Sequence, residues 1–217
     1  MKSYYSKDFD VFEKRYRSTL FNSLSGFKSL NLIGTKSANG INNLGLFNSI
    51  FHLGANPFLI GFILRPDGPQ HDTLHNIEST NKYTLNLVSK AIFSNAHMAS
   101  ARYPSGVSEF NPCGLTEWTS ESGFEPYVKE SPVRFGMNLR EIIPVKLNDT
   151  KIVIGEVMEL HLDEPGIITQ DGFARLEMAN IVTNLGLDAY YSATYLQRIA
   201  YAKPFSSPEP ILNQTEL

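Results

Sequence analysis

The chain has 217 residues, of which 42% are hydrophobic and 19% charged, so we expect one domain, or one domain with extensions, around a sizeable core. Its net charge of −3 argues against a nucleic-acid partner, because proteins that bind polyanions usually carry a basic surface. The single cysteine, Cys113, excludes an intramolecular disulfide and argues against a cysteine-based metal site. The longest apolar run, Phe58 to Leu64, is too short to cross a membrane, and residues 1–17 lack a signal-peptide core. We therefore expect a cytoplasmic protein without a membrane partner.

In the first third of the chain, a charged segment is followed by residue patterns typical of strands. Residues 1–28 mix charges and aromatic residues, which predicts a short helix and a loop docked on the surface. Leu30–Thr35 and Asn43–Phe51 are predicted strands, and the Asn56-Pro57 turn ends the second. Phe58–Leu64 is short and continuously apolar, which favours a strand buried on both faces.

The middle of the chain alternates between loops and short elements. Arg65–Pro69 is a predicted loop, and a short helix capped by Asp72 follows it. Tyr83–Val88 has strand alternation, and Ala91–Ala101 is a predicted helical stretch. Tyr103–Gly123 is rich in Pro, Gly and Ser, which predicts a long loop of a kind that is often functional.

The last third contains the two longest predicted strands, Val133–Val145 and Lys151–Leu162. Val157 breaks the alternation of the second, which indicates a bulge or a barrel corner. Arg175–Asn184 reads as a short helix or an irregular turn. Together these elements predict a mainly β fold, a β-barrel with short helices, over residues 29–203. Residues 1–28 form an N-terminal extension in this scheme, and residues 204–217 form a flexible tail.

The familiar catalytic motifs are absent from the sequence. It has no GxGxxG after a strand, no GxxxxGK[ST], no HExxH and no GxSxG, which argues against the enzyme classes that use them. Only His71 and His75 are spaced as a metal pair, and no carboxylate is patterned beside them, so we expect no metal site.

A candidate phosphate site lies between Phe47 and Asn76. Asn48 and Ser49 interrupt an otherwise apolar strand, either as solvent-facing polarity or as contacts to a polar ligand. Arg65 follows an apolar strand, and its guanidinium suits a phosphate unless it is only a solvated rim charge. The His71-Asp72-Thr73 helix start adds unpaired N–H groups and the hydroxyl donor of Thr73, whereas the Asp72 carboxylate suits a cap or an orienter of Arg65.

The order of these segments resembles that of the flavin reductase-like, FMN-binding split β-barrel family, of the flavoredoxin kind. The similarity covers roughly residues 30–165 and is carried by the runs Ile33-Gly34-Thr35, Asn39-Gly40, Asn43-Leu44, Asn48-Ser49-Ile50-Phe51, Pro57, Arg65, Asp72-Thr73, Asn76-Ile77, Tyr83-Thr84-Leu85-Asn86, Ser108-Glu109-Phe110, Gly114-Leu115-Thr116 and Glu130-Ser131-Pro132-Val133.

The resemblance implies a six-stranded split barrel, a homodimer and FMN bound without a covalent link near the subunit interface. It implies flavin contacts from the Asn48-Ser49 strand and phosphate contacts from Arg65 and the Asp72-Thr73 helix start. The cofactor-binding residues expected on this basis are Thr35, Phe47, Asn48, Ser49, Phe51, Arg65, His71, Asp72, Thr73 and Asn76. The flavin carries the redox chemistry, so the sequence needs no nucleophile or general base, and we name no catalytic residue.

Three functions share these features: an FMN-dependent reductase fed by NADH or NADPH, an electron carrier with a redox protein partner, and a non-catalytic flavin-binding module. A pyridoxamine oxidase-like barrel is a further alternative, although the basic phosphate-binding residues of that family are not recognised here. Many reductases of the resembling family carry a His-Gly-Arg-like segment where this chain reads Asn184 to Tyr191, which leaves nicotinamide use open. The long Tyr103–Gly123 loop or the Asp188–Tyr191 segment is expected to cover the open flavin face.

Overall fold

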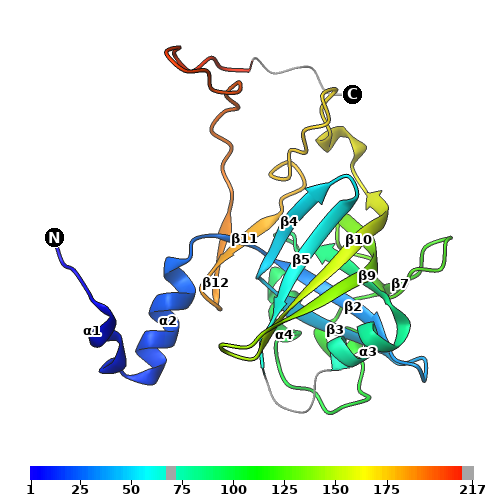
Figure 1. Cartoon of the computed structure of the whole chain (residues 1–217). Helices are drawn as coiled ribbons and strands as arrows, with labels where there is room; N and C mark the ends of the chain where they lie inside the picture. The colour runs from blue at the N-terminus through cyan, green and yellow to red at the C-terminus, as the bar shows by residue number, and fades with distance from the viewer. Residues whose placement is uncertain (67–71, 212–217) are drawn as a thin grey trace.

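The computed structural model describes residues 1–66 and 72–211, and it contains a seven-stranded antiparallel sheet that forms a split barrel (Figure 1). In spatial order the strands are β3 (Asn42–Phe47), β2 (Asn31–Lys36), β6 (Lys82–Leu87), β9 (Val133–Val145), β10 (Thr150–Leu162), β5 (Phe58–Leu64) and β4 (Ile50–Ala55). The two edge strands, β3 and β4, follow each other in sequence. The sheet is therefore split at residues 48–49, and the predicted mainly β barrel is confirmed.

The barrel interior is filled by apolar side chains that alternate along the strands. Phe62, Tyr83 and Met137 are fully buried there, and helix α3 (Asp72–Thr80) closes one side with Leu74 and Ile77. The pairing of β9 with β10 slips in register between Val157 and Glu159, which confirms the predicted bulge.

The predicted strand Asn43–Phe51 is wrong as one element. The chain pairs with β2 up to Phe47, then leaves that ladder and pairs with β5 from Ile50 onward. Between the two strands, Ser49 keeps a single backbone contact, in which Ile63 N–H donates to its carbonyl at 3.0 Å. A change of partner strand cannot be read from alternation alone, because both halves keep the period of a strand.

A second, three-stranded sheet lies beside the barrel, with the order β1 (Lys28–Ser29), β11 (Val182–Leu185) and β12 (Ala189–Ser192). The prediction of a helix or turn over Arg175–Asn184 is therefore wrong for its last three residues. Turns occupy residues 176–180, and the 3-10 helix η1 (Pro165–Ile167) precedes them. The β11–β12 hairpin is short, and Tyr190 and Tyr191 supply its strand propensity.

The predicted Tyr103–Gly123 loop contains two short elements, helix α5 (Phe110–Cys113) and strand β7 (Glu117–Trp118), which pairs with β8 (Tyr127–Val128). Helix α4 (Phe93–Met98) precedes this segment and occupies only the middle of the predicted Ala91–Ala101 stretch. Phe110 and Cys113 are buried against Leu44 and Val88, so most of this region packs as a second core outside the barrel.

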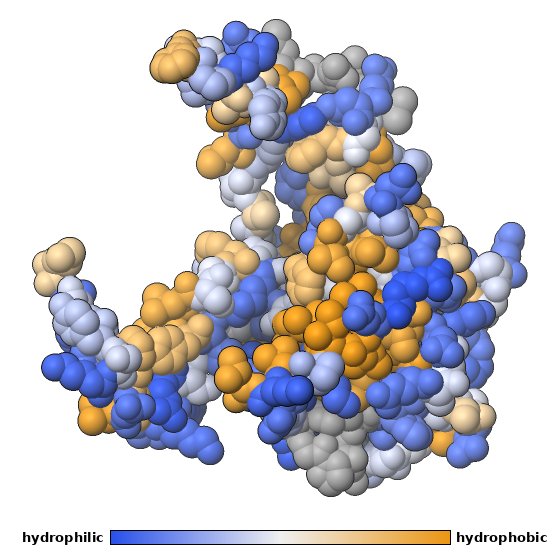
Figure 2. All heavy atoms as spheres, viewed as in Figure 1, coloured by the Kyte–Doolittle hydropathy of each residue, from blue (hydrophilic) through white to orange (hydrophobic). Residues whose placement is uncertain are grey.

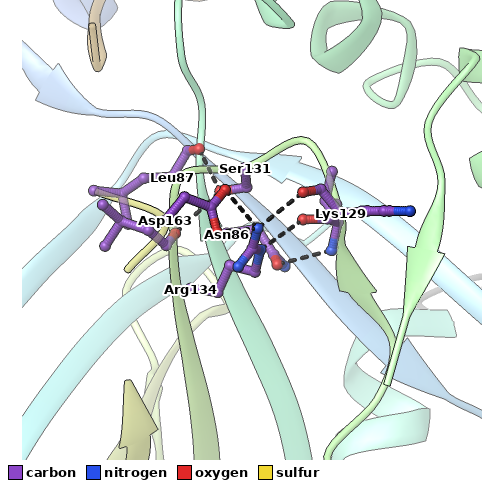
Figure 3. Close-up of polar contacts among 8 residues, drawn as sticks. Asn86, Leu87, Lys129, Ser131, Arg134 and Asp163 are labelled. Carbon is purple, nitrogen blue, oxygen red and sulfur yellow. Dashed lines mark hydrogen bonds and ion pairs between the residues drawn. The ribbon is translucent and has the colours of Figure 1, made fainter. Parts of the chain in front are cut away.

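The β8 segment is fixed by the buried Arg134 (Figure 3). Its Nε donates to the carbonyl of Val128 at 3.0 Å, and one terminal nitrogen donates to the carbonyl of Lys129 and to the Asp163 carboxylate, each at 2.8 Å. Asn86 assists from β6, because its Oδ1 accepts the Val128 N–H at 2.9 Å. Two of the three guanidinium nitrogens of this buried charge thus have partners, one of them a carboxylate, which explains how an arginine is tolerated there.

The N-terminal extension forms helices α1 (Ser6–Asp10) and α2 (Lys14–Leu24), neither of which contains a buried residue. They stand beside the barrel rather than lying flat on it (Figure 1). The last turn of α2 forms hydrogen bonds with Lys28 and Arg65 through Asn22. At the other end, residues 204–210 are exposed. Among the described helices, none is long and apolar enough to cross a membrane.

Candidate functional site

A cavity of about 430 Å³ lies at the split of the barrel. The end of β3, the break after it, the end of β5 and the start of α3 form most of its wall. Its lining consists of Leu30, Gly45, Leu46, Phe47, Asn48, Ser49, Ile63, Leu64, Arg65, Thr73, Ala99, Ser100 and Leu187. Five of the predicted cofactor-binding residues are therefore brought together, and mostly apolar neighbours surround them, as is usual for a small-molecule pocket.

Gly45 allows close packing in the wall of this cavity. A Cβ at this position would come within 2.9 Å of the Phe47 ring and within 3.4 Å of Thr73 Oγ1. The missing side chain lets the Phe47 ring pack against the backbone of β3 at that point. Apolar side chains, among them Leu46, Ile63 and Leu64, border the cavity and suit an aromatic ring system, so the residues present fit a flavin.

Asn48 shapes the cavity by its bonds to the neighbouring hairpin, and Ser49 bonds to Asn48. Asn48 Nδ2 donates to Asn184 Oδ1 at 2.7 Å and to the carbonyl of Gly186 at 2.9 Å. Ser49 Oγ donates to Asn48 Oδ1 at 3.3 Å. The amide donors of Asn48 are thus used within the protein, and they hold the β11–β12 turn, with the half-exposed Leu187, at the cavity mouth.

Arg65 lies at the rim of the cavity, next to the last turn of α2. It is exposed, and its guanidinium donates to Asn22 Oδ1 at 2.8 Å, while Lys28 Nζ donates to the backbone carbonyl of Asn22 at 2.7 Å. Burial and, secondarily, the nearby Arg65 charge lower the pKa of Lys28. Within the described part of the chain, neither cation forms an ion pair with a carboxylate, so this rim is suited to an anionic group.

Thr35 and Asn76 do not line the cavity. Both are buried, and Asn76 Nδ2 donates to Thr35 Oγ1 at 3.0 Å. Thr35 Oγ1 lies 3.2 Å from Asn43 Oδ1, and Asn43 Nδ2 contacts the buried Glu109 carboxylate at 2.8 and 3.0 Å. These residues join β2, β3, α3 and the start of α5 in one network behind the cavity wall.

The other predicted residues lie around the rim or beyond it. Asp72 accepts a hydrogen bond from Ser105 Oγ at 3.0 Å and does not line the cavity. Phe51 is on the outer face of β4, where its ring covers Gly61. Thr73 does line the cavity, but its hydroxyl already contacts Asn43 Oδ1 at 3.1 Å. His71 lies outside the described residues.

Leu187, Leu30, Ala99 and Ser100 also line the cavity, and sequence reasoning missed them. No signal could have identified them, because they come from a hairpin turn, the strand start and a helix end that meet only in the fold.

Neither of the two segments expected to cover the cavity places its tyrosines over it. Tyr103 packs against the outer core, with its hydroxyl 3.7 Å from Cys113 Sγ, and does not line the cavity. In the Asp188–Tyr191 segment, Tyr190 contacts His97 Nδ1 at 2.5 Å, and Tyr191 packs on Phe27. The aromatic side chains of both segments therefore point elsewhere.

A second cavity, of about 610 Å³, separates α2 from the β11–β12 turn. It adjoins the first, because Leu187 lines both. Its charged lining residues are Glu13, Lys14, Arg15 and Asp188. Among the residues that the structure describes, no group of three or more His, Cys, Asp or Glu side chains could hold a metal ion.

Residues 28–177 match the family model described as "Flavin reductase like domain". The chain belongs to this family. A split-barrel protein from Shewanella frigidimarina, described as a candidate flavin reductase, is 40% identical, with a TM-score of 0.88 over 93% of this chain and 100% of that one.

Two further solved structures share the fold of this flavin reductase-like chain. Nitrilotriacetate monooxygenase component B from Bacillus cereus is 20% identical, with a TM-score of 0.79 over 91% of this chain and 98% of that one. Flavoredoxin from Desulfovibrio vulgaris (Miyazaki F) is 24% identical, with a TM-score of 0.67 over 83% and 92%. The family supports a flavin-related redox function for the chain, and the resemblance identified from the sequence is confirmed.

Proposed function

We propose that this chain binds FMN without a covalent link in the cavity at the barrel split and acts as a flavin reductase-like oxidoreductase. The observation that carries the proposal is the cavity itself, which lies at the break between β3 and β4 and combines a mostly apolar wall with a cationic rim at Arg65. A flavin accepts and releases electrons through its own ring, so the chain contributes binding, orientation and exclusion of water.

The protein side chains divide these tasks. Leu30, Leu46, Ile63 and Leu64 provide an apolar lining that favours a ring over water. Arg65 supplies a fork of charged donors for the FMN phosphate. Asn48 keeps the β11–β12 turn in place, which limits the width of the cavity mouth.

A nicotinamide dinucleotide is the electron donor in this proposal. The second cavity beside α2 offers space next to the first one, and Lys14 and Arg15 offer charge for a pyrophosphate. Glu13 and Asp188 line the same cavity, so their negative charges oppose that attraction and favour weak binding. We therefore expect reduction of the bound flavin by NADH or NADPH to be slow compared with dedicated flavin reductases.

Absorbance spectroscopy tests the proposal directly. The purified protein should be yellow, or should take up FMN at micromolar concentration, and failure to do either would refute it. Anaerobic stopped-flow mixing with excess NADH or NADPH should then bleach the flavin band over seconds to minutes. Absence of bleaching, together with rapid reduction by dithionite, would favour the alternative of a carrier that receives electrons from a redox protein, which the flavoredoxin-like fold supports.

We also propose a homodimer. Large apolar side chains remain exposed on β4, β5 and β10, and Figure 2 shows hydrophobic residues gathered over these strands. They include Phe51, Leu53, Phe58, Met158 and Leu160. Contiguous apolar patches of this kind mark association surfaces, and a twin subunit would also cover the open edge of β4.

A further inference from the structure

The buried network behind the cavity wall has one possible direction of hydrogen bonding, and the Glu109 carboxylate sets it. This group receives the Leu44 N–H at 2.7 Å and the Asn43 amide at 2.8 and 3.0 Å. Burial raises the pKa of Glu109, and the Leu44 N–H opposes that shift. All these neighbours are donors, so the carboxylate acts as an acceptor, and the Asn43 amide nitrogen must face it.

The oxygen of the Asn43 amide consequently faces the opposite side. Two hydroxyls lie against it, Thr35 Oγ1 at 3.2 Å and Thr73 Oγ1 at 3.1 Å. An amide oxygen only accepts, so each hydroxyl donates its single proton to it. Asn76 Nδ2 donates to Thr35 Oγ1 at 3.0 Å, which fits the same direction.

Thr73 is the member of this network that lines the cavity, where its oxygen lies beside Gly45. Its proton is directed at Asn43, so the oxygen presents lone pairs to the cavity. A phosphate monoester near pH 8 also presents lone pairs and no proton, because its second pKa is about 6. The two oxygens would repel each other, and a neutral donor group would be the favourable neighbour.

From this geometry we propose that Thr73 Oγ1 is a hydrogen-bond acceptor inside the cavity, with Glu109 as the positioning residue that acts through Asn43. The ligand group against Thr73 is a donor of the flavin, either the ring N3–H or a ribityl hydroxyl, and not a phosphate oxygen. This inference rests on the proposed flavin function and corrects the expectation that Thr73 donates to the phosphate. The phosphate contact then belongs to Arg65.

The first test compares FMN with riboflavin, which lacks the phosphate, in wild type and Thr73→Val at pH 8. The valine keeps the shape and removes the acceptor. Affinity should fall for both ligands by the same factor, about two- to tenfold for one neutral hydrogen bond. A loss confined to FMN, or no loss for either ligand, would overturn the inference. Thr35→Val is the matched control, because Thr35 donates to the same amide oxygen but is buried away from the cavity.

Two further probes identify the donor group. 3-Methylriboflavin lacks the ring N3–H, and lumiflavin lacks the ribityl chain. The Thr73→Val effect should disappear with 3-methylriboflavin if the ring is the donor, and with lumiflavin if the ribityl chain is. An effect of unchanged size on both probes would show that Thr73 acts on the fold and not on a ligand donor.

The positioning role is tested with Glu109→Gln. A glutamine amide can donate to Asn43, which allows the Asn43 amide to turn over and the Thr73 proton to point into the cavity. Glu109→Gln should therefore weaken riboflavin binding in the wild-type background and leave it unchanged in the Thr73→Val background. Equal losses in both backgrounds would contradict the relay. Wild-type protein that binds no flavin would refute the proposed function instead, so the two failures are distinguishable.

Discussion

Replacing Arg65 by alanine is the sharpest test of where the cofactor phosphate lies. A hydrogen bond between a charged donor and an ion contributes about 1.5–3 kcal/mol. Arg65 is exposed and part of its donor capacity is used on Asn22 Oδ1 at 2.8 Å, so the lower end of this range applies. We expect FMN affinity to fall about tenfold or somewhat more, and riboflavin affinity to change by less than about twofold.

The assay is fluorescence titration of each flavin at fixed pH and two salt concentrations. Because screening weakens exposed charges, the FMN penalty should shrink as salt increases. Asn22→Ala is the control for an indirect effect, since it removes the contact between Arg65 and α2 but keeps the guanidinium. It should leave the ratio of FMN to riboflavin affinity near the wild-type value.

Equal losses for FMN and riboflavin in Arg65→Ala would refute the phosphate assignment. The same conclusion would follow if Asn22→Ala reproduced the full FMN-specific loss, because the attachment of α2 would then be the cause. In that case Lys28 would be the next candidate for the phosphate contact. Its ammonium also donates to Asn22, and the nearby charge of Arg65 contributes to the lowering of its pKa.

Three other outcomes follow from the fold. Gly155→Ala would place a Cβ 2.1 Å from the hydroxyl of the buried Tyr83. This clash should lower the free energy of unfolding, measured by urea denaturation, by about 1–3 kcal/mol. Gly166→Ala is the control and should leave that free energy unchanged, because Gly166 has open space around it. Phe58→Glu on the exposed patch should raise the dimer dissociation constant more than tenfold by sedimentation, and a wild-type monomer would contradict the proposed homodimer. Burial opposes the ionisation of Glu159, but side-chain hydrogen bonds outweigh burial and lower the pKa of this carboxyl to about 2. The stability that the ionised carboxylate contributes above pH 4.5 should therefore be lost as the pH falls toward 2. Glu159→Gln should reduce the change in unfolding free energy between pH 4.5 and pH 2 by up to the order of 3 kcal/mol. Identical acid-unfolding profiles for wild type and Glu159→Gln would rule the effect out.

The parts of the fold that could be predicted from the sequence are those with strong local signals. Phe58–Leu64 has the predicted bounds because a short, continuous apolar run has few alternatives to a buried strand. The bulge at Val157 was also detectable, because a register slip changes which side chains face inward. The β11–β12 hairpin was missed, since its four-residue strands are short and its pairing with β1 joins residues far apart in sequence.

The candidate site shows a different limit. Thr35, Asn43 and Asn76 belong to the ordered pattern that indicated the family, yet the structure uses their side chains to bond one another behind the cavity wall. A sequence pattern indicates that a polar residue is needed at a position, but a buried hydrogen-bond network and a ligand contact both need one. Only the directions of the hydrogen bonds separate the two roles. In this network the directions start at a carboxylate and end at Thr73, so residues that never reach the cavity still determine which chemical group the cavity accepts.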